Sequence, residues 1–345
     1  MVRETIVIYR LGSLGDTVVA LPCFHRIAKS YPSARRVLLT NFPVASMAAP
    51  LPAILGESGL IDDSIAYPLK TRSPLKLLRL SLAIRALRAR TLIYLMPPRG
   101  RLAAVRDYIF FRLSGIREVI GLPLSRNLQT RVVDKESGFL ERECERLART
   151  MSALGPIDLA NLSSWDLLLT QPELAVGQRI ADQLNNGPFI AINMGGKAVE
   201  NDWGEERWTE LLRRLTLAFT NMGLLIVGST EDLARASTAA TCWQGAVVNA
   251  CGSLSPRESA AALHGASLFI GHDSGPLHLS AACGVPCIGL FGDLHRPRVW
   301  HPYGSMHRSI HCTSGMSGIS VDQVFETAAL LLSASAKEFK LVKAT

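Results

Sequence analysis

Residues 271–278, with the sequence GHDSGPLH, combine side chains and turns that can bind a phosphate group. The segment follows a short apolar run and opens a stretch of helical character. A turn of small residues at a helix N-terminus exposes backbone N–H groups and the positive end of the helix dipole, which suits a diphosphate. Ser274 and His278 can donate to the same anion, and Asp273 can accept from a sugar hydroxyl. Alternatively, Asp273 and Ser274 only cap the helix.

A second turn, RLGSLGD at residues 10–16, contains two glycines after an apolar run. Glycines let the backbone approach a ligand closely, although this spacing is not the GxGxxG fingerprint of dinucleotide-binding folds. Asp16 could serve as a general base that takes a proton from a hydroxyl group. From the sequence alone, a cap of the helix that starts there is the more common role for such a residue.

Two further turns have a similar plan. In residues 193–197, NMGGK, Lys197 follows two glycines and could neutralise a leaving phosphate, although surface lysines are usually only solvated. In residues 228–232, GSTED, Glu231 or Asp232 could bond ribose hydroxyls, as acids do in dinucleotide folds.

The elements that carry these turns alternate between strand and helix. Short β-branched or apolar runs predict strands, and longer amphipathic stretches predict helices. Such βαβ series indicate parallel sheets with helices on both faces. The predicted strands are 5–9, 37–40, 65–67, 91–95, 189–193, 224–228, 246–249, 268–270 and 287–290, and the predicted helices are 16–30, 74–90, 173–184, 208–220, 256–264, 277–283 and 321–333.

The alternation loosens over residues 155–172, where Gly, Pro, Asn and Ser accumulate. We therefore expect a first Rossmann-like domain over residues 1–165, a linker over 166–187 and a second Rossmann-like domain over 188–320. A C-terminal helix and tail would cover 321–345. Two such halves leave a cleft between them, and ligands bind at the carboxyl ends of their strands.

Composition narrows the class of protein. The chain of 345 residues is 48% hydrophobic and 19% charged, which is typical of a globular protein. Its seven cysteines are scattered and lack metal-binding spacing, so a reducing compartment and no metal site are expected. We see no secretory signal and no apolar run long enough to span a membrane. These features predict a cytoplasmic protein, for which any contact with a membrane would be peripheral.

Residues 70–106 contain ten basic residues and no acid, although the whole chain has a net charge of only +8. Within them, residues 74–90 predict a basic helix with leucines near one face. Such a helix can lie on anionic lipid head groups or meet an anionic acceptor. It can also be the solvated face of an ordinary domain. Nucleic acid is a weaker candidate, because aromatic residues are 6% of the chain and none interrupt the basic run.

Taken together, these segments resemble glycosyltransferase family 9, whose best-known members are ADP-heptose:lipopolysaccharide heptosyltransferases. Residues 14–22, LGDTVVALP, are similar to the N-terminal motif of that family. Residues 273–279, followed by 284–286 and 291–292, are similar to its more specific donor-site signature, and residues 300–304 continue that pattern. Residues 106–116 resemble a subset of the family.

The resemblance implies a GT-B fold, in which two Rossmann-like domains with parallel sheets face each other across a cleft. The first domain would bind the acceptor and the second a nucleotide-sugar donor, with no other cofactor. Asp16 would be the general base. The implied acceptor contacts are Arg10, Ser13, Gly15 and Arg99, and the implied donor contacts are Gly196, Lys197, Glu231, Asp232, Leu254, Asp273, Ser274, Gly275 and His278.

Physical chemistry is consistent with these roles. A helix N-terminus and Lys197 are fixed positive partners that can stabilise a leaving diphosphate without a metal ion. One carboxylate suffices for direct displacement with inversion of the anomeric carbon. The sequence departs from the family pattern at two places, and the first, in a loop that approaches the donor, leaves the donor's identity open. Residues 201–208 read NDWGEERW where many members carry KRWP, and His272 precedes the aspartate of the donor signature.

Several alternatives remain open. A heptose from ADP-heptose and a lipopolysaccharide or other surface-glycan acceptor are expected, but another nucleotide sugar and another acceptor would use the same elements. The same fold also hosts nucleotide-sugar epimerases. A NAD-dependent oxidoreductase is disfavoured by the missing GxGxxG. A binding protein without catalytic activity would share the phosphate site.

Overall fold

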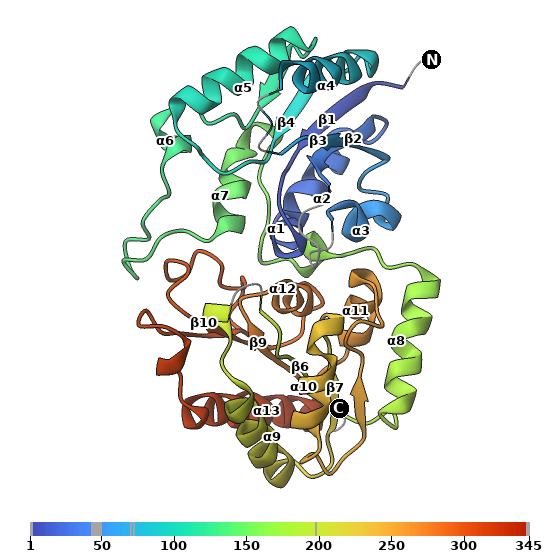
Figure 1. Ribbon diagram of the computed structural model, residues 1–345, viewed down its shortest axis with the longest axis vertical. Coiled ribbons are helices and arrows are strands. Elements are labelled where there is room, and N and C mark those ends of the chain that lie inside the picture. Colours follow the sequence, from blue (N-terminus) through green and yellow to red (C-terminus); the bar gives the residue numbers. More distant parts are fainter. Residues whose placement is uncertain (1–2, 43–49, 70, 72, 197–198, 343–345) are drawn as a thin grey trace. The chain divides into compact units, whose positions relative to one another are not determined.

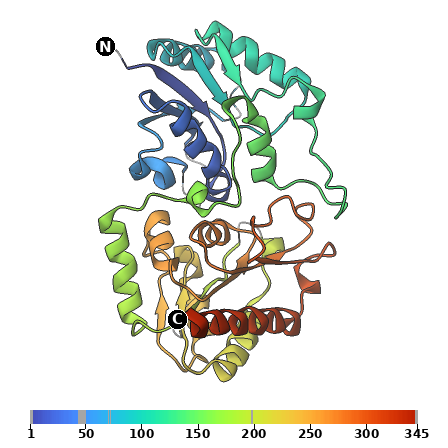
Figure 2. The ribbon, with the colours of Figure 1, turned by 180° about the vertical axis from the view of Figure 1, so that it is seen from behind.

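The computed structural model describes residues 3–42, 50–69, 71, 73–196 and 199–342. The chain forms two compact units, residues 1–168 and 169–345, and each unit has its own parallel sheet (Figures 1 and 2). The division falls within the stretch where the strand–helix alternation loosens. It lies near the start of the predicted linker at 166–187.

The sheet of the first unit has five strands in the order β3-β2-β1-β4-β5. All neighbouring strands run parallel, and Val7 of β1 lies opposite Val37 of β2 and Leu92 of β4. Both faces are covered, so β1, β2 and β4 are almost entirely buried. The strands are β1 (Thr5–Tyr9), β2 (Arg35–Asn41), β3 (Asp63–Tyr67), β4 (Thr91–Tyr94) and β5 (Glu118–Ile120).

Helices cover both faces of this sheet (Figure 1). Val7 and Tyr9 point to one face, where they pack with Leu80 and Ile84 of α4 and with Phe111 of α5. The alternate residues of the strands point to the other face. The α-helices are α1 (Leu14–Val18), α2 (Leu21–Ser30), α3 (Pro52–Leu55), α4 (Pro74–Ala86), α5 (Arg101–Leu113), α6 (Arg126–Gln129) and α7 (Glu143–Thr150), and the 3₁₀ turns are η1 (Gly56–Ser58), η2 (Ser152–Leu154) and η3 (Leu162–Trp165).

The sheet of the second unit has six parallel strands in the order β11-β10-β9-β6-β7-β8. Counted from the first strand of each unit, β1 and β6 occupy the same place, so both sheets share the order 3-2-1-4-5. The strands are β6 (Phe189–Asn193), β7 (Gly223–Ile226), β8 (Val247–Asn249), β9 (Leu268–His272), β10 (Cys287–Phe291) and β11 (Arg308–His311).

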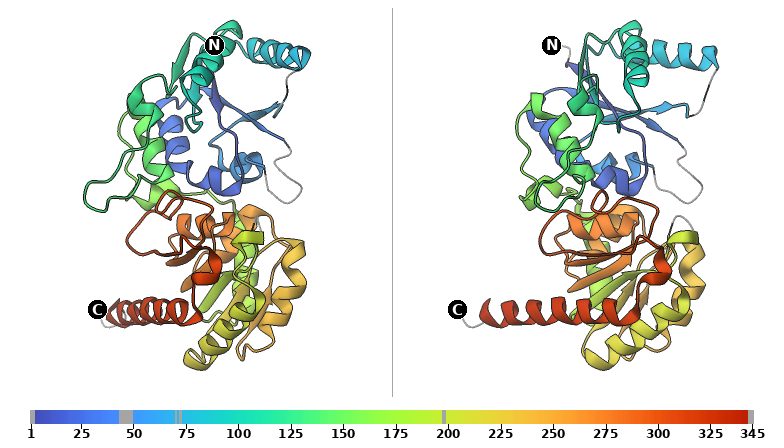
Figure 3. Two further views of the ribbon diagram at one scale, coloured as in Figure 1. Left: turned by 60° about the vertical axis from the view of Figure 1, so that its left-hand side comes forward. Right: turned by 90° about the vertical axis from the view of Figure 1, so that its left-hand side faces the viewer.

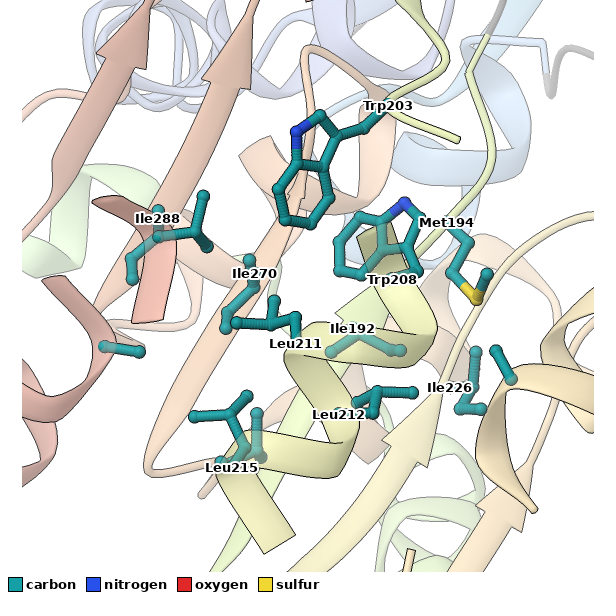
Figure 4. Close-up of a cluster of buried hydrophobic side chains, with 14 of the residues drawn as sticks. Ile192, Met194, Trp203, Trp208, Leu211, Leu212, Leu215, Ile226, Ile270 and Ile288 are labelled. Atoms are coloured by element: carbon teal, nitrogen blue, oxygen red, sulfur yellow. The ribbon is translucent and has the colours of Figure 1, made fainter. Parts of the chain in front are cut away.

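The core of the second unit lies between this sheet and α9, α10 and α13. Trp203 and Trp208 are fully buried and meet edge to face, with ring centroids 5.2 Å apart, above Ile270 of β9 (Figure 4). The α-helices are α8 (Gln171–Gln183), α9 (Glu205–Ala218), α10 (Leu233–Ala240), α11 (Pro256–Leu263), α12 (Gly275–Ala282) and α13 (Val321–Val342), and the 3₁₀ turns are η4 (Val199–Asn201), η5 (Thr230–Asp232) and η6 (Met316–Gly318).

Helix α8 lies in the segment predicted to be a linker, yet it packs tightly on α11. Gly177 of α8 approaches Ala261 so closely that a Cβ atom on the glycine would lie 2.4 Å from the Ala261 carbonyl oxygen. The guanidinium of Arg257 also donates two hydrogen bonds to the Glu173 carboxylate, at 2.6 and 2.9 Å. This helix is therefore part of the second unit.

Strand order determines where ligands can bind. In each sheet successive strands are added first on one side of the first strand and then on the other, so the strand order reverses between β1 and β4 and between β6 and β9. Loops that leave the carboxyl ends of such strand pairs diverge and form binding sites in open α/β sheets. Residues 10–16 follow β1, and residues 273–278 follow β9, so both predicted turns lie at these positions. Within the described residues, no helix has both the length and the apolar character that a membrane crossing requires.

Candidate active site

Asp16 lies in the first turn of α1, and its two carboxylate oxygens differ in surroundings. Oδ2 accepts hydrogen bonds from the Ser13 backbone N–H at 2.8 Å and from the Ser13 hydroxyl at 2.9 Å. Oδ1 lies 3.8 Å from Nη2 of Arg10, and the side chain is 28% exposed. Ser13 is the N-cap and Asp16 the third helical residue, so the two form a capping box. Capping therefore uses one oxygen and fixes the orientation of a carboxylate that solvent can still reach.

Gly12 makes this arrangement possible. Its φ of +154° lies at the edge of the range that favours glycine, and a Cβ atom there would lie 2.5 Å from Cβ of Asp16. Its N–H donates to Oδ1 of Asn41 at 2.9 Å, which ties the turn to the end of β2. A side chain at position 12 would thus displace the Asp16 carboxylate.

Arg10, predicted to contact an acceptor, is buried with 1% of its surface exposed. Nη1 donates to the Leu95 carbonyl at 2.6 Å, and Nη2 donates to the Asp16 carbonyl at 2.8 Å. These bonds join the ends of β1 and β4 beneath the start of α1. The guanidinium supports the turn from inside, so direct contact with an acceptor is not what the structure indicates for it.

Glu143 of α7 supplies a negative charge beside this buried arginine. One of its oxygens lies 3.6 Å from Nη1 of Arg10, and its carboxylate accepts hydrogen bonds from Arg146 at 2.7 and 2.8 Å and from Arg131 at 2.6 Å. Burial alone would raise the pKa of Glu143, but the hydrogen bonds of Arg146 and the charges of Arg10 and Arg131 lower it to about 2. Glu143 is therefore ionised and holds the cluster together.

Arg99, the other predicted acceptor-binding arginine, follows β4 and is about one third exposed. Its Nη2 donates to Oδ2 of Asp107 at 2.6 Å and to the Tyr94 hydroxyl at 3.2 Å. Burial opposes its charge, but the Tyr94 hydrogen bond and the nearby charges raise the pKa of Arg99. Arg106 also pairs with Asp107, at 2.7 Å, so two arginines share one carboxylate. An anion could approach the exposed part of this pair.

In the second unit, Asn193 at the end of β6 binds the start of α12. Its Oδ1 accepts a hydrogen bond from the Ser274 hydroxyl at 2.9 Å, and its Nδ2 donates one to the Val227 carbonyl at 2.9 Å. The hydroxyl of Ser274 was predicted to donate to a phosphate, but its proton is directed to Asn193. What Ser274 and Gly275 offer an anion is the N-terminus of α12, where backbone N–H groups point outward along the helix.

Asp273 lies beside two histidines at the same end of α12. Oδ1 of Asp273 is 4.0 Å from Nε2 of His278, and Oδ2 is 3.6 Å from Nε2 of His295. The Trp300 ring is near both histidines, with its centroid 6.3 Å from that of His278 and 5.8 Å from that of His295. Asp273, Ser274, Gly275 and His278 thus lie together at the start of α12, and His295 and Trp300 lie near them.

His272 joins two loops beneath this region. Its Nε2 accepts the Trp203 backbone N–H at 3.1 Å, and its Nδ1 lies 3.2 Å from the Gly195 carbonyl. A carbonyl only accepts, so Nδ1 carries the proton. Burial lowers the pKa of His272 to about 4, so the ring is neutral. This departure from the family pattern therefore anchors the glycine turn after β6.

Asp232 serves the same turn. Its Oδ2 accepts from the Ser229 backbone and hydroxyl at 3.1 and 2.9 Å, and a Cβ atom on Gly195 would lie 2.2 Å from it. Arg235 bridges this carboxylate, the Met194 carbonyl and Asp202. Asp232 is thus engaged within the protein.

The other predicted donor contacts differ in exposure. The neighbouring Glu231 is exposed. Leu254 and Gly196 are partly buried, and Lys197 lies outside the described residues.

Sequence reasoning missed Glu143, Arg146 and Arg235. Glu143 and Arg146 lie on a helix that was not predicted, although their i, i+3 spacing of opposite charges is a helical signal. The missed helix α10 carries Arg235, whose partners lie on other loops.

Comparisons with known proteins identify the family and the fold of this chain. The model of glycosyltransferase family 9 (heptosyltransferase) matches residues 114–320. A family 9 glycosyltransferase from Veillonella parvula is 20% identical with a TM-score of 0.72, and the alignment covers 96% of this chain and 98% of that one. No match was found among curated protein sequences.

Two Escherichia coli enzymes have similar folds. ADP-heptose lipopolysaccharide heptosyltransferase II is 17% identical with a TM-score of 0.67, covering 96% of this chain and 99% of that one. Heptosyltransferase WaaC, solved with ADP, is 16% identical with a TM-score of 0.65, covering 95% and 100%. The fold is thus of the GT-B type, with two Rossmann-like units. With the family model matching more than half of its length, the chain belongs to glycosyltransferase family 9 and is a glycosyltransferase.

Proposed function

We propose that this enzyme transfers a heptose from ADP-heptose to a lipopolysaccharide or other surface-glycan acceptor, with inversion at the anomeric carbon. Family membership supports a nucleotide-sugar donor, and the names of the two similar E. coli enzymes favour ADP-heptose. The observation that carries the proposal is the Asp16 carboxylate, which is oriented by Ser13 and remains open to solvent.

Asp16 acts as the general base in this proposal. The acceptor hydroxyl oxygen attacks the anomeric carbon while the bond from that carbon to the diphosphate oxygen breaks. The nucleoside diphosphate leaves with the electron pair, and the hydroxyl proton passes to Oδ1 of Asp16. A base that acts in the transition state contributes about 10²- to 10⁴-fold to the rate.

The leaving diphosphate gains negative charge, which the N-terminus of α12 is oriented to stabilise. His278 and Lys197 are the side chains that we assign to the same anion, and Gly196 lets the backbone approach it. Glu231 would bond the ribose, and Leu254 would contact the nucleotide base. Arg99 would meet an anionic group of the acceptor. We propose that no metal ion takes part, so transfer should persist in excess EDTA.

We also propose a cytoplasmic location. All seven cysteines carry free thiols: Cys23, Cys144, Cys242, Cys251, Cys283, Cys287 and Cys312. Free thiols persist in the reducing cytoplasm.

The test compares Asp16→Asn and Asp16→Ala with Asp63→Asn, a matched change of a surface aspartate on β3. Product formation is followed by mass spectrometry, and donor binding by calorimetry. We expect both Asp16 variants to lose at least about a hundredfold in transfer with donor affinity nearly unchanged. Asp63→Asn should behave like the wild type. Substantial transfer by Asp16→Ala would remove this residue from the base role.

The donor is identified by thermal shift with ADP-, GDP-, UDP- and CMP-sugars. Ligand that binds only the folded state raises stability by RT ln(1 + [L]/Kd), so the preferred nucleotide gives the largest shift. A larger shift with another nucleotide sugar would replace ADP-heptose in the proposal and leave Asp16 untouched.

A further inference from the structure

Helix α4 exposes a row of leucines on the side that faces away from its sheet. Leu75, Leu78 and Leu82 are 67%, 55% and 55% exposed. Their spacing of three and four residues places them on one face of the helix. The opposite face buries Leu80 and Ile84 in the core. The sheet therefore does not account for the outer leucines.

Helix α5 repeats the pattern over a longer distance. Leu102, Val105, Ile109 and Leu113 follow at spacings of three and four residues and are 89%, 44%, 52% and 67% exposed. Phe111 and other residues of the inner face are buried. Isolated exposed leucines are ordinary, but rows at helical spacing indicate a surface that something else covers.

The two rows belong to neighbouring helices on one face of the first sheet (Figure 3). The Ser114 hydroxyl, directly after α5, donates to the Ser81 hydroxyl of α4 at 2.9 Å. Nη1 of Arg85 on α4 donates to the Leu113 carbonyl at 3.1 Å. We refer to the outer sides of these two helices as the α4–α5 face.

The charge of this face is strongly positive. Helices α4 and α5 together contain six basic residues and one acid. That acid, Asp107, is buried and bonded to Arg99 and Arg106, so it does not reach the surface as a free negative charge. All six basic residues are exposed: Lys76, Arg79, Arg85, Arg101, Arg106 and Arg112.

We propose that the α4–α5 face docks on an anionic lipid bilayer. Leucines would enter the boundary between head groups and acyl chains, while arginines and Lys76 would bind lipid phosphates, as in amphipathic helices that lie in the interface. Charge favours this occupant. A second copy of the chain would bring two positive faces together, and a nucleic acid would leave the apolar rows uncovered.

The test is co-sedimentation of the full chain with vesicles of phosphatidylglycerol and phosphatidylcholine, compared with vesicles of phosphatidylcholine alone. One variant removes apolar groups, Leu78→Gln with Leu82→Gln. A second removes charges, Lys76→Gln with Arg79→Gln. The matched control changes two equally exposed leucines of the second unit, Leu217→Gln with Leu330→Gln. Circular dichroism and urea unfolding of each variant confirm that both units are folded.

We expect the wild type to bind the anionic vesicles and not the neutral ones. The leucine variant should bind at least tenfold more weakly. The charge variant should lose about fivefold for each basic residue removed, since one basic group near an anionic surface contributes about 1 kcal/mol. The control should match the wild type.

Equal binding of the wild type and the leucine variant would overturn the proposal, as would wild-type binding to neutral vesicles alone or to neither kind. If the leucine change instead abolished a dimer seen by sedimentation velocity, the face would be assigned to self-association. None of these outcomes bears on the donor or on Asp16, so this inference and the proposed reaction fail separately.

Discussion

Replacing Glu143 by glutamine removes one negative charge from a buried cluster while keeping the shape of the side chain. The carboxylate is 2% exposed and lies among Arg10, Arg131 and Arg146. Lowering its pKa from 4.5 to about 2 corresponds to about 3 kcal/mol of stability at pH 7. Removing one partner of a buried ion pair costs about 3–5 kcal/mol, which agrees in size. We expect Glu143→Gln to destabilise the first unit by about 3 kcal/mol.

The pH dependence has a defined sign. The folded-state pKa of Glu143 is lowered, so its contribution is complete above about 4.5 and disappears as the pH falls toward about 2. At pH 3 less than half of that contribution remains. The difference in unfolding free energy between wild type and variant should therefore shrink by about half between pH 7 and pH 3.

Pulsed hydrogen exchange during urea titration measures this difference in peptides from β1 and α7, which report on the first unit alone. Glu210→Gln is the control, and its effect is measured in the same experiment in peptides from α9, in its own unit. The pKa of Glu210 is also lowered to about 2, by hydrogen bonds from Arg213 and Arg214, but this glutamate lies at the surface, where solvent screens the pair. The reasoning fails if Glu143→Gln is as stable as the wild type at pH 7, or if the difference does not change with pH.

Three other substitutions test the supports of the site. Gly12→Ala should lower kcat at least about tenfold with donor affinity retained, because the new Cβ meets Asp16; crystallographic displacement of that carboxylate would confirm the cause. His272→Gln should weaken donor binding in calorimetry. In the wild type, the free energy of unfolding should fall between about pH 6.5 and 4, because the unfolded chain protonates His272 in this range and the folded state does not. The variant should lack this fall. Gly177→Val should destabilise the second unit by about 1–3 kcal/mol in urea titrations, since Ala261 blocks a side chain there.

Much of the fold could be predicted, because short apolar runs in the sequence form the buried strands of the two sheets. The runs at residues 5–9 and 189–193 became β1 and β6 with the predicted bounds. The helix predicted over residues 16–30 is instead two helices, and Pro22 marks the start of the second. The basic helix ends at Ala86 rather than at residue 90, because Arg88 adopts a positive φ of 52°.

The limits of prediction are clearest at Arg10. The family resemblance implied an acceptor contact for Arg10, and spacing along the chain could not reveal that it is buried. Its counter-charge comes from Glu143, on a helix far along the sequence. Local pattern finds the turns that meet a ligand, whereas the contacts that orient those turns are long-range and emerge only when strands and helices are assembled.

Each unit of this enzyme is one unbroken length of chain with its own sheet and core. Residues 169–345 carry all of the donor-binding side chains that we assign, together with the histidine, arginine and asparagine that orient them. The second half can therefore be expressed alone as a starting point for spectroscopy of nucleotide binding. The same fragment can be used to screen for inhibitors of that binding in the absence of the acceptor. Cutting the chain at one peptide bond would give a fragment that binds the donor alone, so donor recognition could be measured without the second substrate.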